Sequence, residues 1–90
     1  MNNQKIIYMD GIFDMFHFGH ANALKQAKQL YPNVYLLVGI PSEDDTIKFK
    51  GKTIMSIDER IQSLEHCKWV DEIVKDAPWE ITENFMKKMG

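Results

Sequence analysis

The chain has 90 residues, with 11 basic and 13 acidic side chains and a formal net charge of −2. This length allows one domain at most, and the near balance of charge argues against nucleic acid as a partner. A single cysteine excludes a disulfide framework, no apolar run is long enough to span a membrane, and the polar first residues do not form a signal peptide, so we expect a protein of the cytoplasm with no membrane segment.

The first half of the chain predicts two buried strands joined by a helix. Lys5–Met9 is a short apolar run with β-branched and aromatic residues, and Val34–Gly39 is continuously apolar, as is typical of a covered parallel sheet. Between them, an amphipathic helix starts near Gly19 and ends before Pro32. Its predicted apolar stripe consists of Ala23, Leu24, Ala27, Leu30 and Tyr31.

The second half begins with a polar stretch, residues 41–53, which we expect to be a surface loop with a helical turn at most. Ser56–Glu59 is a capping box that predicts the start of a second helix. Its expected apolar face consists of Ile57, Ile61, Leu64 and Cys67. Val70–Val74 predicts a third, short strand, and Thr82 could cap a last helix with Ile81 and Met86 as its hydrophobic staple.

Strands that alternate with helices predict an α/β fold, with a Rossmann-like parallel sheet and flanking helices. So few strands and helices are not enough to complete such a fold. We therefore expect residues 1–90 to be the truncated, N-terminal part of a single larger catalytic domain.

The residues that follow the first strand are the strongest candidates for a functional site, because ligands of parallel sheets bind at the carboxyl ends of the strands. Gly11 lets the backbone turn close to a ligand. His17 and His20 are three residues apart and flank Gly19 at a helix amino terminus, where free N–H groups attract an anion. Both rings can donate a hydrogen bond to a phosphate oxygen.

Two other interpretations of these histidines stay open. They could be packed or exposed side chains without a role. They could also ligate zinc together with His66 and Cys67, although adjacent residues at the end of a helix point in divergent directions. Their position at a strand-to-helix junction favours the phosphate site.

Residues 11–20, Gly-Ile-Phe-Asp-Met-Phe-His-Phe-Gly-His, resemble the HxGH signature of the nucleotidyltransferase superfamily. Further segments, in order and at similar spacing, resemble the choline-phosphate branch of the cytidylyltransferases: residues 48–52, 58–60, 66–72 and 76–79. The resemblance covers nearly the whole chain from Ile6 onward. It implies that a phosphate oxygen of phosphocholine attacks the α-phosphorus of CTP and releases pyrophosphate, in the synthesis of phosphatidylcholine.

The resemblance also implies roles for single residues on the nucleotide side. His17 and His20 would hold the α- and β-phosphates as charge builds up, and Ile12 and Phe13 would offer backbone groups to the nucleotide. Lys50 would bridge the phosphates of both substrates, although a loop lysine is usually only solvated. Lys48 and Lys52 are weaker candidates for that role.

At the alcohol end, a quaternary ammonium has no hydrogen to donate and is bound by aromatic faces and a carboxylate. By resemblance, Trp79 would form a wall of this cage and Asp10 would supply the counter-charge. Ordinary packing is the alternative for Trp79, and Trp69 is expected in the core or at an interface.

The resemblance further implies Mg²⁺ with the CTP and a homodimer through residues 68–72, where Lys68 stands in place of the usual arginine. A later family motif, Arg-Thr-x-Gly-Ile-Ser-Thr, does not occur in these residues, so we expect little activity from them alone. The alternatives are an ethanolamine-phosphate cytidylyltransferase, an adenylyltransferase of the same superfamily, and a non-catalytic nucleotide-binding or dimerisation module.

Overall fold

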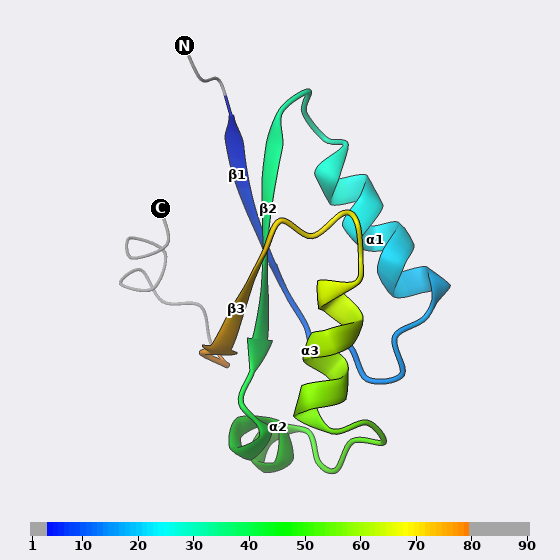
Figure 1. Cartoon of the computed structure of the whole chain (residues 1–90). Coiled ribbons are helices and arrows are strands. Elements are labelled where there is room, and N and C mark those ends of the chain that lie inside the picture. Colours follow the sequence, from blue (N-terminus) through cyan, green and yellow to red (C-terminus); the bar gives the residue numbers. More distant parts are fainter. Residues whose placement is uncertain (1–3, 80–90) are drawn as a thin grey trace.

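A computed structural model describes residues 4–79 of the chain. Its elements follow in the order β1 (Lys5–Asp10), α1 (Phe18–Lys28), β2 (Val34–Pro41), α2 (Glu43–Phe49), α3 (Ile57–Glu65) and β3 (Glu72–Ala77). The strands form one parallel sheet in the order β1-β2-β3 (Figure 1). The predicted α/β fold with a parallel sheet is therefore confirmed, while the helix expected at Thr82 lies outside the described residues.

The register of the sheet brings the carboxyl ends of its strands to one edge. The pairing of β1 with β2 runs from Lys5 opposite Val34 to Asp10 opposite Gly39. The pairing of β2 with β3 continues to Pro41, which lies opposite Ala77. The central strand β2 is almost entirely buried, which confirms the interpretation of its continuous apolar run. The loops that follow the strands therefore lie close together at this end of the sheet.

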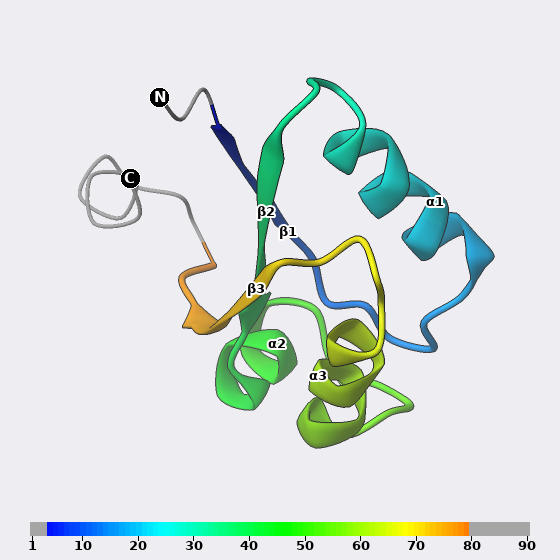
Figure 2. The same cartoon turned by 45° about the horizontal axis from the view of Figure 1, so that its top comes forward.

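The hydrophobic core lies between one face of the sheet and the helices α1 and α3, which cover that face together (Figures 1 and 2). Leu36, Val38 and Ile40 alternate along β2 and so point to the same side. They meet Leu24 of α1 and Leu64 of α3, which are also fully buried. Packing on this one face fixes where both helices begin and end relative to the sheet.

The predicted first helix was too long and its apolar stripe was partly wrong. α1 ends at Lys28, so Leu30 and Tyr31 lie beyond it and are 65% and 50% exposed. Leu24 and Ala27 are buried as expected, but Ala23 is exposed. The helix stops early because the chain has to turn back into β2, and Ala23 faces a pocket instead of the core.

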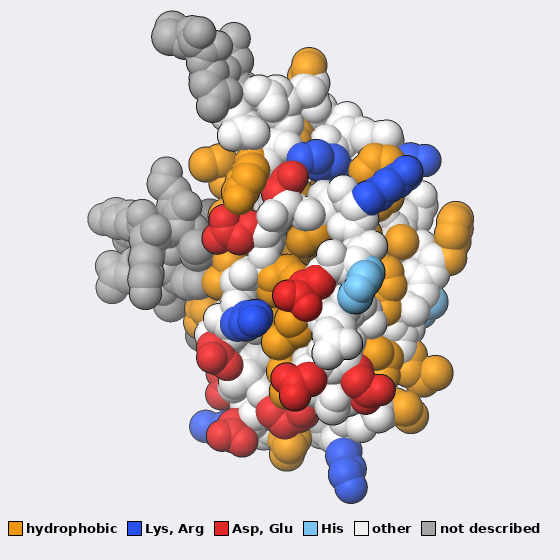
Figure 3. Space-filling view, viewed as in Figure 1, with side chains coloured by type: hydrophobic (Ala, Val, Ile, Leu, Met, Phe, Trp, Pro, Cys, Tyr) orange, Lys and Arg blue, Asp and Glu red, His pale blue; other side chains and the backbone are white. Residues whose placement is uncertain are grey.

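The polar stretch 41–53 is more ordered than predicted, because Glu43–Phe49 forms the helix α2. The Ser42 hydroxyl accepts the Asp45 N–H at 3.1 Å and caps this helix. The run of acidic residues, read as a solvated loop, occupies the first turn, where the helix dipole favours negative charge. Acidic side chains gather over this end of the molecule, around α2 and α3 (Figure 3).

The capping box of α3 is confirmed in both directions. The Ser56 hydroxyl accepts the Glu59 N–H at 3.1 Å, and the Glu59 carboxylate accepts the Ser56 N–H at 3.0 Å. The third strand lies further along the chain than predicted, at Glu72–Ala77. Its pairing with β2 begins at Glu72, which lies opposite Leu37.

The carboxylate of Asp71 ties the amino ends of β2 and β3 to the last turn of α1. It pairs with the Lys28 ammonium and accepts the Leu36 N–H at 2.7 Å, while Lys28 also donates to the Val34 carbonyl. Partial burial opposes ionisation, but the hydrogen bonds from Lys28 and Leu36 outweigh it and lower the pKa of Asp71.

Replacing Asp71 by asparagine should therefore lower stability at neutral pH by about 0.5–1 kcal/mol after solvent screening. A carboxylate with a depressed pKa stabilises the fold above its unfolded pKa, and this contribution disappears as the pH falls through the folded pKa. Urea unfolding of Asp71→Asn and the unchanged protein should converge below about pH 4. Glu65→Gln on the exposed end of α3 is the control, and a pH-independent difference for Asp71→Asn would contradict the assignment.

Candidate active site

A pocket of about 530 Å³ opens at the edge where the strands end. The end of β1 and the loop after it form one wall, the start of α1 a second, and the ends of α2 and β3 a third. All the predicted site residues except His17 line it: Asp10, Gly11, Ile12, Phe13, Gly19, His20, Lys50 and Trp79. The parallel-sheet rule predicted the site after the first strand, and residues from distant parts of the chain, Lys50 and Trp79, converge on it.

His17 lies beside the pocket as the N-cap of α1, and it forms a reciprocal cap with His20. The Nδ1 atom of His17 accepts the Gly19 N–H at 2.9 Å, and the Nδ1 atom of His20 accepts the His17 N–H at 3.1 Å. Their ring centroids are 4.1 Å apart. The sequence spacing is that of a Ser-x-x-Glu capping box, built here from imidazoles.

This cap fixes the tautomer of both histidines. A ring nitrogen that accepts a hydrogen bond carries no proton, so each neutral ring keeps its N–H at Nε2. The expectation of free backbone donors at this helix end was partly wrong, because the imidazoles consume the N–H groups of His17 and Gly19. The Nε2–H groups of the two imidazoles, in place of these backbone N–H groups, are the donors available to bind an anion.

Gly19 is required by the same arrangement. A Cβ atom at this position would lie 2.7 Å from Cε1 of the His17 ring. Gly11 keeps space for the Phe13 ring in a similar way, at 2.9 Å, and it does not adopt a left-handed conformation. Within the turn after β1, the residues with positive φ are Phe13 and Met15, at 56° and 49°, so this turn is made by non-glycine residues that need external support.

His20 is held in its neutral form. Burial, and next the neighbouring His17, lower the pKa of His20 below its usual value. The rings of Phe13 and Phe16 lie at 5.6 and 5.5 Å from the His20 ring. A neutral imidazole at this position donates through Nε2 and accepts through Nδ1 at the same time.

Proton-detected nitrogen NMR should find Nε2 protonated on His20 at neutral pH, with a titration midpoint below about 6.5. Protonation of Nδ1 would break the bond from the His17 N–H, so the folded state disfavours it. Because the folded pKa is lowered, the cap stabilises the fold above the usual histidine pKa and is lost as the pH falls below it. A tautomer with the proton on Nδ1 would contradict the reciprocal cap.

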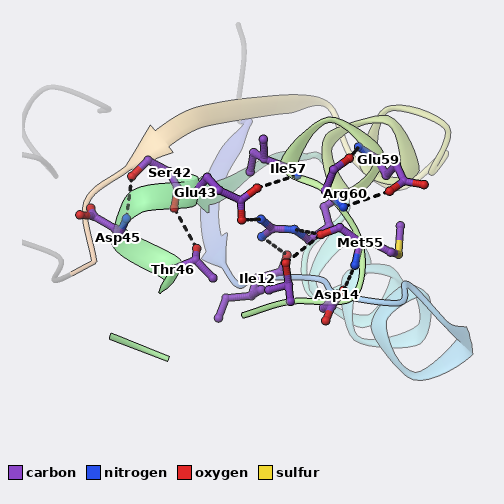
Figure 4. A network of polar contacts seen from close by, with 12 residues as sticks. Ile12, Asp14, Ser42, Glu43, Asp45, Thr46, Met55, Ile57, Glu59 and Arg60 are labelled. Carbon is purple, nitrogen blue, oxygen red and sulfur yellow. Dashed lines mark hydrogen bonds and ion pairs between the residues drawn. The ribbon is translucent and has the colours of Figure 1, made fainter. Parts of the chain in front are cut away.

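The loop after β1 is held from behind by Arg60, a fully buried residue of α3 (Figure 4). Its guanidinium donates to the Ile12 carbonyl at 3.2 Å, to the Met55 carbonyl at 3.3 Å and to the Glu43 carboxylate at 3.2 Å. The other oxygen of Glu43 accepts the Ile57 N–H at 3.1 Å. One side chain thus connects the pocket loop, the start of α2 and the segment before α3.

Asp14 makes a second connection, between the same loop and residues 54–55. Its carboxylate oxygens accept the N–H groups of Ile54 and Met55 at 2.9 and 2.8 Å. These hydrogen bonds keep the pKa of Asp14 below its usual range. Asp14 lines the pocket, but both of its carboxylate oxygens already accept backbone N–H groups.

Arg60 had no role in the sequence interpretation, although its position offered a sign. It follows Ile57 by three residues and precedes Leu64 by four, so it lies on the apolar face of α3. A charged residue in such a stripe has to find buried partners. Its carbonyl partner Ile12 is 48 residues away in sequence, a distance that local patterns do not reveal.

Arg60→Met should destabilise the protein by about 1–3 kcal/mol, because Glu43 and buried carbonyl groups lose their donor. Arg60→Lys should recover only part of this, since an ammonium cannot match the planar guanidinium fork. Unfolding in urea measures both, with Lys52→Met on the exposed loop as the matched control. Equal stability of Arg60→Met and the control would contradict the role of the guanidinium.

The remaining predicted pocket residues come from the ends of three different elements. Lys50 is the C-cap residue of α2, Asp10 ends β1, and Trp79 follows β3. Lys48 and Lys52 do not line the pocket. Trp69 packs partly buried against the core, with Lys68 and Lys25 over its ring at 4.6 and 5.7 Å.

The zinc alternative finds no support in the described residues. His66 lies at the end of α3, where its Nδ1 atom is 2.7 Å from the Gln62 carbonyl. Among residues 4–79, no group of His, Cys, Asp or Glu side chains is arranged to hold a metal ion. No helix in that range has the length and apolarity needed to cross a membrane.

Comparison with known proteins identifies the family of the chain. Residues 8–90 match the model of the cytidylyltransferase-like family, and the chain belongs to that family. It is 60% identical over 82 residues to choline-phosphate cytidylyltransferase 2 of Arabidopsis thaliana, covering 91% of this chain and 27% of the relative. It is 54% identical over 80 residues to choline-phosphate cytidylyltransferase A of Homo sapiens, covering 89% and 22%.

A relative with a different name is less similar. The ethanolamine-phosphate cytidylyltransferase of Arabidopsis thaliana is 48% identical over 83 residues, covering 92% of this chain and 19% of the relative. The chain spans about a quarter of the length of the curated relatives it matches.

Proposed function

We propose that the protein carrying this chain transfers a cytidylyl group from CTP to phosphocholine, giving CDP-choline and pyrophosphate for phosphatidylcholine synthesis. The observation that carries the proposal is the lining of one pocket by two sets of groups. His20 and Lys50 suit phosphate oxygens, while Asp10 and Trp79 suit a quaternary ammonium. The choline-phosphate relatives at 60% and 54% identity support this choice of substrate.

The reaction needs orientation and charge stabilisation more than a protein nucleophile. A phosphate oxygen of phosphocholine forms a bond to the α-phosphorus of CTP, and the bond from that phosphorus to the bridging oxygen breaks, with the electron pair leaving on pyrophosphate. His17 and His20 donate from Nε2 to the α- and β-phosphates. The Lys50 ammonium approaches from the other side and offsets the charge of both substrates.

The backbone of Ile12 and Phe13 is proposed to position the nucleotide. The Ile12 carbonyl is already held by Arg60, so this strand end presents a fixed edge to the ligand. Gly11 and Gly19 keep the approach open, because side chains at either position would collide with neighbouring rings. Because this backbone is already ordered, less conformational entropy would be lost when a triphosphate binds.

Mg²⁺ is proposed to enter with the triphosphate, whose oxygens supply much of its coordination. Of the two pocket carboxylates, Asp14 already accepts a backbone N–H group on each oxygen, which favours a metal ion that arrives with the triphosphate. Bound there, Mg²⁺ would neutralise charge on the phosphates.

A homodimer and a cytoplasmic location complete the proposal. Within the predicted interface segment 68–72, Asp71 and Glu72 make contacts inside the chain, to Lys28 and to the Tyr35 hydroxyl. The exposed Lys68 and the partly buried Trp69 and Val70 therefore remain its candidate contact residues.

His20→Ala should lower turnover by about two to three orders of magnitude, as expected when one donor to a developing charge is lost. The assay is formation of labelled CDP-choline by the natural protein that carries these residues. His66→Ala is the matched control, because this histidine lies outside the pocket on α3. Equal activity of both variants would remove the histidine pair from the mechanism.

The same assay should distinguish the substrates. Phosphocholine should be preferred over phosphoethanolamine, because a primary ammonium seeks hydrogen-bond acceptors and not an aromatic wall. CTP tested against ATP settles the base. Preference for phosphoethanolamine would refute the assigned substrate, and CTP binding without any product would indicate a non-catalytic module.

A further inference from the structure

Phe49 lies directly before Lys50 at the end of α2 and has no contact with the pocket itself. Its ring stacks on the indole of Trp79, with centroids 5.2 Å apart and an interplanar angle of 20°. The Lys48 ammonium is 5.1 Å from the centroid of the Phe49 ring. A cation, a phenyl ring and an indole thus form a consecutive series that ends in the pocket wall.

Among the described residues 4–79, the stack on Phe49 is the ring contact that Trp79 makes. The indole is 36% exposed, and it follows Pro78 immediately after the last strand. An exposed tryptophan can adopt several rotamers, and only those that direct the ring toward the pocket would serve a ligand. Phe49 covers one face of the indole, so the surface that Trp79 gives to the pocket comes from its other face and its edge.

Phe49 also connects the two pocket residues Lys50 and Trp79. Lys50 lines the pocket from the residue after Phe49, and Trp79 lines it from the ring that Phe49 contacts. The α2 terminus therefore supplies the phosphate-side cation directly and supports the aromatic wall indirectly. Phe49 itself is 52% exposed and is absent from the hydrophobic core, so core packing does not explain an aromatic residue here.

We infer that Phe49 is a positioning residue for the ammonium-binding end of the site, acting through its stack on Trp79. This inference rests on the proposed function, since it concerns how that site selects a quaternary ammonium. It assigns Phe49 no contact with substrate. Its effect should appear in the affinity for the alcohol substrate, and not in CTP binding or turnover.

The test is a double-mutant cycle with Phe49→Leu, Trp79→Leu and the double variant, assayed in the natural protein that carries this chain. Phe49→Leu should raise the KM for phosphocholine by about two- to tenfold, the range of one aromatic pair, with kcat and the KM for CTP nearly unchanged. In the Trp79→Leu background the same change should have almost no further effect, because the contact no longer exists.

Phe49→Tyr should keep the stack and restore the KM for phosphocholine. Additive effects of Phe49→Leu and Trp79→Leu, or equal rises in the KM for both substrates, would overturn the positioning role. If the unchanged protein does not convert phosphocholine, the proposed function fails instead, so the two failures can be told apart.

Discussion

The arrangement of the pocket depends on the burial of one positive charge. A guanidinium removed from water has to be compensated by hydrogen bonds and opposite charge. Arg60 finds its acceptors on segments that no regular hydrogen-bonding pattern connects: the loop after β1, the start of α2 and the stretch before α3. The planar donor fork restricts how these segments can lie relative to one another, so the buried charge helps to position the pocket walls.

The loop after β1 shows why such support is needed. Phe13 and Met15 both adopt positive φ, a conformation that costs free energy in residues with a side chain. The loop keeps it because Arg60 holds the Ile12 carbonyl and Asp14 accepts N–H groups from the facing segment. The strain lies beside the proposed phosphate site, where the histidines have to be presented at fixed positions.

The sequence predicted those features whose causes are local. The apolar runs predicted β1 and β2, and Ser56–Glu59 predicted the start of α3, because the partner groups lie within a few residues. The parallel-sheet rule predicted the site after β1, whereas Lys50 and Trp79 were assigned only by resemblance to the family, and all of them line one pocket. The failures involve non-local contacts. The start of β3 at Glu72 depends on pairing with β2, and Arg60 depends on the Ile12 carbonyl, 48 residues away in the chain.

The end of β3 places Trp79, the proposed choline-binding residue, in the same pocket as the proposed phosphate-binding residues. The pairing of β2 with β3 shifts between Ile40 and Pro41, and Asp76 takes a left-handed conformation opposite this shift. The irregularity turns the chain so that Pro78 and Trp79 reach the pocket edge, where Phe49 meets the indole. Because the same α2 terminus carries Lys50, any movement of that terminus displaces the cation and the aromatic wall together. This coupling would help a site to select phosphocholine, because the phosphate and the quaternary ammonium of one substrate have to reach Lys50 and Trp79 at a fixed separation.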